Sequence, residues 1–168
     1  MIWLINCLTI RQFYLLLACQ AADLIAGIVA YSGTTFLDPG RCQPSEPVSV
    51  LHVHATAETA FFYLGGALNP NLLSGYFPGN MPPYPGAVRS VQIWAAYNGA
   101  SGLVTDPAPS LDLTADVPGL DTLVARYTNS PPGGAVELWS IIGAGHGPAF
   151  SSEFSPRVID WLLAHPRP

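Results

Sequence analysis

Two side chains that could move a proton follow apolar runs, at the points where strands are expected to end. His146 stands in GAGHG and directly follows the strand-like stretch 135–145, while Glu58 stands in HATAE after the stretch 48–56. The glycines around the histidine let the backbone bend tightly, so an imidazole can project from the edge of a sheet. A carboxylate there could accept a hydrogen bond from the imidazole and hold its tautomer and orientation. The two residues are therefore a candidate acid–base pair.

A hydrolase that uses such a pair also needs a nucleophile, usually a serine or cysteine on a sharp strand-to-helix turn written G-x-S-x-G. This motif does not occur in the sequence. The nearest stretch, GASGL around Ser101, lacks the final glycine and follows an expected helix rather than a strand. Ser32 ends an expected strand, but no glycine stands two residues before it and no helix start follows. Neither serine is expected to act as a nucleophile.

His52 and His54 suggest a competing function, because residues two apart in a strand point to the same face, as in some metal sites. Only His146 and His165 remain as further imidazoles, and the cysteines do not occur as ligand pairs. A histidine at the end of a strand more commonly hydrogen-bonds loop backbone. We therefore expect neither a metal site nor a cofactor.

The stretches that predict secondary structure follow the order helix, strand, strand, helix, strand, strand, helix. Short apolar runs indicate buried strands, and apolar residues at helical spacing with terminal signals indicate helices. The segment 65–87 is dense in Gly, Pro and Asn and predicts a long loop. This order favours an α/β fold with a mostly parallel sheet, whose reactive groups lie beyond the carboxyl ends of the strands. The expected helices are 11–23, 87–100 and 155–166, and the expected strands are 24–33, 48–56, 121–128 and 135–145.

Composition is that of one compact domain. The chain has 168 residues, of which 49% are hydrophobic and only 10% charged. The net charge of -5, with six Lys and Arg and no basic stripe, speaks against a nucleic-acid partner. The three cysteines, Cys7, Cys19 and Cys42, allow either one disulfide and a leftover thiol or three buried thiols.

The N-terminal stretch is apolar without the pattern of a membrane span or a typical leader. Polar residues such as Asn6, Arg11 and Gln20 interrupt it before it reaches the roughly 18–20 residues that cross a bilayer. The residues before Cys19 could be read as a lipoprotein cleavage site, but the apolar core 13–18 is shorter than the roughly 7–15 residues of a normal signal. The sequence therefore indicates a buried helix and no convincing signal peptide.

Several separated motifs resemble the C-terminal half of the polyhydroxybutyrate depolymerase and feruloyl esterase-like family of secreted α/β-hydrolases. The resemblance runs from about Tyr14 to the C-terminus and includes LHVHATAE, PGAVRSVQIWAAYNGAS and GGAVELWSIIGAGHGPAF. It implies an N-terminally truncated α/β-hydrolase fold, with a mostly parallel sheet flanked by helices. It places the family's acid on Glu58 and its catalytic histidine on His146, and it puts Cys19 and Cys42 at positions suited to a disulfide.

The chain departs from this family at the acid. Glu58 is one methylene longer than the family's aspartate, and Ala55 stands where the family has glycine. Both changes could displace the carboxylate, and a misplacement of about 1 Å can lower a rate roughly a hundredfold.

A larger departure lies at the N-terminus, where the family has its nucleophile elbow. Residues 1–13, MIWLINCLTIRQF, contain neither Ser nor Gly and form an atypical segment ahead of the domain half 14–168. Without the family's preceding strand, the stretch 24–33 would expose an apolar edge, which is an aggregation hazard. The β-branched and aromatic run 2–10 could fold back and cover that edge.

The resemblance implies carboxylic-ester hydrolysis, in which a serine attacks the ester, His146 shuttles the proton and Glu58 orients the imidazole. Because the nucleophile is missing, this chain alone is expected to be an inactive pseudoenzyme. The implied substrate is a polyester or a feruloylated polysaccharide, and the implied location is extracellular. One alternative is a non-catalytic binding or scaffold module with Tyr76, Phe77 and Tyr84 as its ligand surface. Another is an incomplete reading frame, with the elbow encoded upstream.

Overall fold

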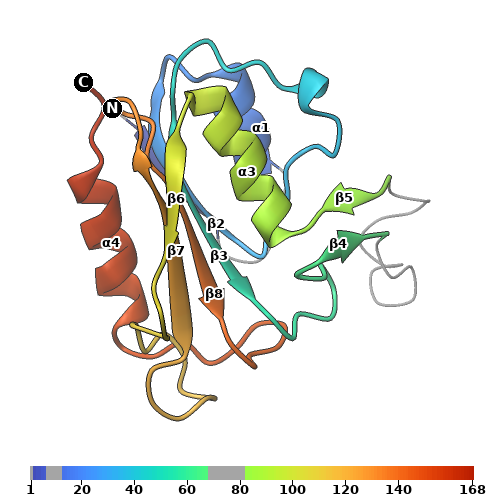
Figure 1. The fold of residues 1–168 in the computed structure, drawn as a ribbon, viewed down its shortest axis with the longest axis vertical. Coiled ribbons are helices and arrows are strands. Elements are labelled where there is room, and N and C mark those ends of the chain that lie inside the picture. The colour runs from blue at the N-terminus through green and yellow to red at the C-terminus, as the bar shows by residue number, and fades with distance from the viewer. Residues whose placement is uncertain (1, 7–12, 68–81) are drawn as a thin grey trace.

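A six-stranded sheet forms the centre of the molecule in a computed structural model that describes residues 2–6, 13–67 and 82–168 (Figure 1). The strand order is β1-β2-β3-β8-β7-β6, and a two-stranded sheet of β4 and β5 lies apart from it. The strands are β1 (Ile2–Asn6), β2 (Ile25–Tyr31), β3 (Ser49–Ala55), β4 (Gly65–Gly66), β5 (Tyr84–Pro85), β6 (Ser101–Thr105), β7 (Thr122–Asn129) and β8 (Val136–Ile141). The helices are α1 (Phe13–Gln20), α3 (Ala87–Asn98), α4 (Phe154–Ala164) and the 3₁₀ turn η1 (Pro39–Arg41).

The expected mostly parallel sheet flanked by helices, as in a truncated α/β-hydrolase, is wrong. The described sheets are mixed: three pairings are parallel (β1 with β2, β2 with β3, β3 with β8) and three are antiparallel (β4 with β5, β6 with β7, β7 with β8). The physical reason is the short connection between β7 and β8. A parallel pair needs a crossover of a dozen or more residues, whereas a short proline- and glycine-rich turn can only reverse the chain. Few helices cover the sheet, because two of its connections are direct strand-to-strand links.

Both faces of the sheet are nevertheless packed. Helices α1 and α3 lie on one face and α4 on the other (Figure 1). The first layer contains Val50 of β3 and Trp94 of α3, and the second contains Leu51 of β3 and Trp161 of α4. Successive residues of β3 thus alternate between two hydrophobic layers, as the pleat of a strand requires.

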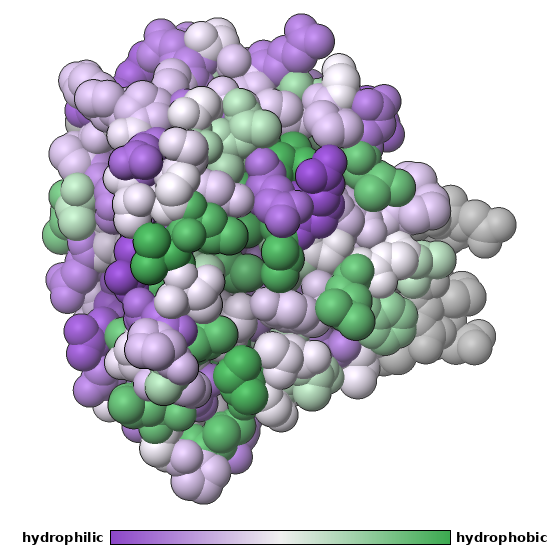
Figure 2. All heavy atoms as spheres, in the orientation of Figure 1, coloured by the Kyte–Doolittle hydropathy of each residue, from purple (hydrophilic) through white to green (hydrophobic). Residues whose placement is uncertain are grey.

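The edge strand β6 was not expected from the sequence. All five of its residues are exposed, and Gly102 adopts a φ of 72°. A strand with no buried face lacks the alternation on which sequence interpretation depends. Figure 2 shows the face over β6, where apolar side chains gather among polar ones, and two exposed apolar residues of β6 are Leu103 and Val104.

Most helix predictions agree with the structure to within a few residues. Helix α3 ends as predicted at Asn98-Gly99, where Gly99 takes a left-handed φ of 68° and its N–H bonds the last turn. The start of α4 was predicted with Ser155 as the N-cap and Pro156 as the first helical residue. The observed N-cap is Glu153, which makes no side-chain capping bond.

Of the N-terminal run 2–10, the described residues Ile2–Asn6 cover the edge of β2, as hypothesised. Strand β1 pairs in parallel with β2, from Ile2 opposite Ile25 to Asn6 opposite Ala30. Cys19 and Cys42 form a disulfide with a Cα–Cα distance of 5.5 Å, joining the end of α1 to the loop before β3. Among the helices of the described segments, none is long and apolar enough to cross a membrane.

Candidate active site

The loops that follow β3 and β8 meet at one edge of the sheet. The two strands are parallel neighbours, and their register brings their last residues, Ala55 and Ile141, opposite each other. The loops then continue side by side, because the N–H of Ala57 donates to the carbonyl of Ala144 at 3.0 Å. Parallel strands from distant parts of the chain thus place two loops in contact at their carboxyl ends, where ligands bind in open α/β sheets.

Glu58 and His146 lie together in these loops. His146 Nδ1 is 2.6 Å from Glu58 Oε1, and the carboxylate side chain is fully buried whereas the imidazole is 34% exposed. An ionised carboxylate can only accept, so the imidazole carries its proton on Nδ1 and donates it. The longer Glu side chain therefore reaches hydrogen-bond distance despite the departures at Glu58 and Ala55. The structure brings the two predicted residues together; their catalytic role remains a prediction.

Other donors also contact the Glu58 carboxylate. Burial by itself would raise the pKa of Glu58, but the N–H of Ala60, the hydroxyl of Ser32 and His146 together hold that pKa below its usual value. The Ala60 N–H donates to Oε1 at 2.8 Å. The Ser32 hydroxyl lies close enough to lower the pKa of Glu58, although it makes no hydrogen bond of standard geometry to the carboxylate. The carboxylate is therefore kept ionised although its side chain is buried.

Ser32 was considered in the sequence only as a nucleophile, and the structure gives it another position. It follows β2, is fully buried and adopts a φ of 46°, the one positive φ of a non-glycine residue in the described chain. A buried hydroxyl cannot reach an ester from solvent. Strand-end position and a neighbouring glycine were the only sequence signals at this serine.

Ser101 is not near the pair. It begins β6, which lies two strands beyond β8 in the sheet. Its partner in the register is Asn129 at the end of β7, so it lies at the opposite edge from the loops of Glu58 and His146. The expectation that it is no part of this site agrees with that placement.

His52 and His54 are both buried on the α3 side of β3, and their rings contact each other. His54 Nε2 lies 2.8 Å from the carbonyl oxygen of Phe61, so this strand-end histidine does bond loop backbone. No group of three or more His, Cys, Asp or Glu side chains within the described ranges could hold a metal ion.

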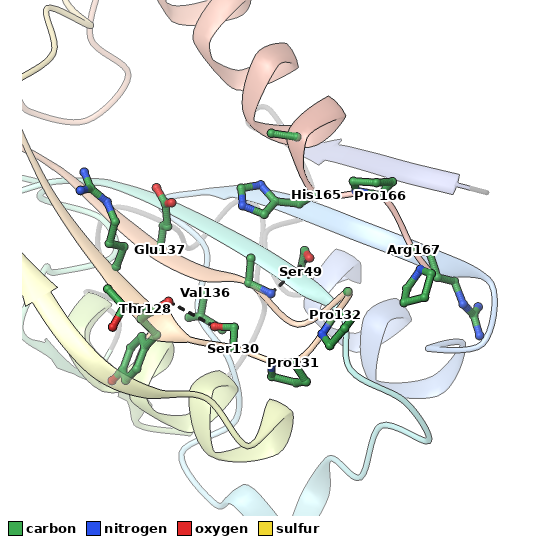
Figure 3. Close-up of a pocket in the computed structure, with 16 residues that line it drawn as sticks. Ser49, Thr128, Ser130, Pro131, Pro132, Val136, Glu137, His165, Pro166 and Arg167 are labelled. Atoms are coloured by element: carbon green, nitrogen blue, oxygen red, sulfur yellow. Dashed lines mark hydrogen bonds between the residues drawn. The ribbon is translucent and has the colours of Figure 1, made fainter.

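One cavity of the described residues lies away from this site. It has a volume of about 580 Å³ and includes Ser49, Glu137 and His165 among its lining residues (Figure 3). Ser49 and Glu137 lie at the start of β3 and β8, so this cavity opens at the sheet edge opposite Glu58 and His146. The cavity and the contact between Glu58 and His146 are thus at separate places in the molecule.

A second hollow, of about 450 Å³, lies nearer to Glu58. It is lined by Phe36, Arg41 and Tyr84 among others. Burial raises the pKa of Tyr84, and the charge of Glu58 contributes to that rise, so the two groups are close. The Tyr84 hydroxyl accepts from the N–H of Phe62 at 2.7 Å, which ties β5 to the Glu58 loop.

Tyr84, one of the aromatic residues considered for a ligand surface, lines this hollow and is only 4% exposed. Tyr76 and Phe77, the other aromatic residues considered for such a surface, lie outside the described residues.

Comparison with known proteins gives one informative relative. No family model matches the chain. The chain is 28% identical over 131 residues to feruloyl esterase B of Piromyces equi, and the match covers 76% of the chain but only 21% of the relative's length. The chain thus spans about a fifth of that protein. The likeness supports an esterase-like relationship.

Proposed function

We propose that Glu58 and His146 are the acid and base of a carboxylic ester hydrolase. The observation that carries this proposal is the 2.6 Å contact between a fully buried carboxylate and a partly exposed imidazole. In such a pair the carboxylate fixes the ring and stabilises the imidazolium, while Nε2 takes a proton from the group that attacks the ester. The esterase relative supports ester chemistry rather than another use of an oriented histidine.

The attacking group is the part that this sequence does not supply in recognisable form. No G-x-S-x-G motif occurs, Ser32 is buried, and Ser101 lies at the other sheet edge. A histidine base without a positioned nucleophile forms no acyl-enzyme. We therefore propose that residues 1–13 take the place of the nucleophile-bearing segment and that the chain by itself does not turn over natural esters.

The substrate class in this proposal is an ester of a feruloylated polysaccharide, in preference to a polyester. The name of the relative favours it, and the 450 Å³ hollow beside Tyr84, with Phe36 at its wall, could receive an aromatic group. An extracellular location is proposed as well, because the Cys19–Cys42 disulfide is of a kind that persists in oxidising compartments.

Two assays test this proposal on the chain as it stands. With methyl ferulate we expect no turnover above background and no labelling by a serine-directed phosphonate. With the activated ester p-nitrophenyl acetate we expect slow, burst-free hydrolysis by the oriented imidazole, abolished in His146→Ala and reduced about tenfold or more in Glu58→Gln.

The matched control is His165→Ala, which removes an imidazole at the far edge of the sheet and should leave the rate unchanged. Hydrolysis that survives His146→Ala would overturn the assignment of the base. A burst together with phosphonate labelling would overturn the proposed lack of a nucleophile.

A further inference from the structure

A pair of buried histidines lies directly beneath the loop that carries Glu58. His52 and His54 are each 1% exposed, and His52 Nε2 is 3.0 Å from His54 Nδ1. Their rings are stacked, with centroids 5.2 Å apart and an interplanar angle of 17°. The far nitrogen of His54, Nε2, then contacts the carbonyl oxygen of Phe61 at 2.8 Å. The contacts form a line from β3 into the loop.

The chemistry of the last contact determines the proton positions along this line. A carbonyl oxygen only accepts, so His54 must carry its proton on Nε2. In a neutral ring Nδ1 of His54 is then an acceptor, and the proton between the two rings belongs to His52 Nε2. Burial, with a smaller contribution from His54, lowers the pKa of His52 well below its usual value, which agrees with a neutral ring. Both histidines are therefore expected as Nε2–H tautomers.

The carbonyl at the end of this line belongs to the Glu58 loop. Phe61 follows Glu58 by three residues, and between them the Ala60 N–H donates to the Glu58 carboxylate. A second contact attaches the same loop to β8: the Tyr63 hydroxyl is 2.7 Å from Ser140 Oγ. Ser140 is the register partner of His54. The loop is thus attached to both β3 and β8 just after its acid.

We propose that His52 and His54 are positioning residues, which act through the Phe61 carbonyl to hold the loop of Glu58 so that its carboxylate meets His146. This inference rests on the proposed function, because only there does the contact between Glu58 and His146 serve catalysis. The contacts from His52 through His54 to Phe61 do not depend on ester chemistry. His54 makes the contact, and His52 fixes its ring and tautomer. Neither histidine touches substrate.

The wild-type chain tests the proton arrangement directly. Two-bond and three-bond ¹⁵N–¹H correlation spectra identify the tautomer of each histidine. We expect Nε2–H for both His52 and His54, with Nδ1 of His54 in the acceptor range. A proton on Nδ1 of His54, with none on Nε2, would overturn the proposal without any substitution.

Substitutions of His54 test the positioning itself. The readout is the Nδ1–H proton of His146, whose resonance lies far downfield only while it bonds the Glu58 carboxylate. In His54→Gln the amide nitrogen can replace Nε2 and donate to Phe61, so the signal should persist. In His54→Leu this donor is lost, and the signal should weaken at least severalfold or disappear.

The matched control is His165→Leu, because His165 Nδ1 also contacts a backbone carbonyl, that of Trp161 at 2.7 Å. It lies at the opposite sheet edge and should leave the His146 signal intact. Far-ultraviolet circular dichroism establishes that each variant is folded; if His54→Leu does not fold, the tautomers and the His54→Gln spectrum decide. A folded His54→Leu with an unchanged His146 signal would refute the positioning role. Since no ester is present, this outcome is separate from failure of the esterase assays.

Discussion

Ser32 has a backbone conformation that most side chains avoid, and it has this conformation beside the buried Glu58 carboxylate. Its φ of 46° falls in the left-handed region, where glycine is favoured. A serine there provides a hydroxyl that helps to lower the pKa of Glu58. Conformation and electrostatics at this residue can be separated experimentally.

The variants Ser32→Ala and Ser32→Gly should both raise the pKa of Glu58, because each lacks the hydroxyl. They should differ in stability, because glycine accepts the positive φ and alanine does not; we expect Ser32→Gly to be more stable than Ser32→Ala by about 1 kcal/mol. Carbon-detected NMR titration of the carboxyl group and urea unfolding measure the two effects. Thr34→Val, which removes a hydroxyl bond to the Pro85 carbonyl, is the control and should not move the pKa of Glu58.

The acid–base pair was accessible to sequence interpretation because each residue directly follows a short apolar run. The positions of Ser32 and the Phe61 carbonyl were not. A serine at a strand end is common, and a backbone carbonyl has no sequence signature. Contacts that depend on how a loop bends back onto a strand appear only once the register of the strands is known.

At the scale of elements, the buried side chain of Asn98 links the end of α3 to the sheet. Asn98 is 4% exposed, and its amide donates to the carbonyls of Val48 and Gly134 while its oxygen accepts from the N–H of Val48. The end of α3 is thus linked both to the start of β3 and to the turn between β7 and β8.

Asn98→Ala should therefore destabilise the fold by about 2–4 kcal/mol, since it leaves three buried backbone groups without partners. Urea unfolding followed by tryptophan fluorescence measures the loss. The control Gln92→Ala removes an exposed amide from the same helix and should change stability by less than about 0.5 kcal/mol. A change below about 1 kcal/mol in Asn98→Ala would show that the link is dispensable.

The pairing of β1 with β2 gives a second element-scale prediction. Without β1, the apolar strand β2 becomes an edge with unpaired backbone groups. Deleting residues 1–10 should lower both the melting temperature and the concentration at which the protein stays in solution. Thermal unfolding and light scattering against the full chain measure this, and unchanged values would show that β1 does not protect the edge.

The sequence predicted the buried strands β2, β3 and β8 well, because hydrophobic packing on both faces produces continuous apolar runs. It failed on the direction of pairing, since runs of this kind do not distinguish parallel from antiparallel neighbours. The direct connection from β7 to β8 was the available signal of an antiparallel pair. Strand β6 had no comparable signal.

At the scale of the whole molecule, several buried ionisable groups should make stability depend on pH. The pKa of Glu58, of Asp121 and of His52 is lowered in the folded state. For all three, stability is fully present above the pKa of the unfolded chain and is lost as the pH falls below it. The loss should start near pH 6.5 with His52 and continue below about pH 4.5 with the carboxyl groups.

Tyrosines set the alkaline limit, because burial raises the pKa of Tyr84, Tyr97 and Tyr127 above the usual value. Their contribution is present below about pH 10 and is lost as the pH rises through the folded-state pKa values. Melting temperatures from pH 4 to 11 should show a plateau between about 7 and 9.5 with a fall on each side. A melting temperature that does not change between pH 7 and 5 would contradict the role given to His52.

The separation of Glu58 and His146 along the chain has a kinetic consequence. The two positions that meet at 2.6 Å are 88 residues apart in the sequence, and their loops depend on the parallel pairing of β3 with β8. Contacts of such high sequence separation slow folding, because the chain loses entropy on closing the loop before the contact can stabilise it. The hydrogen-bonded proton of His146 should therefore be a late signal in refolding, and its appearance would time the moment at which the two halves of the sheet join.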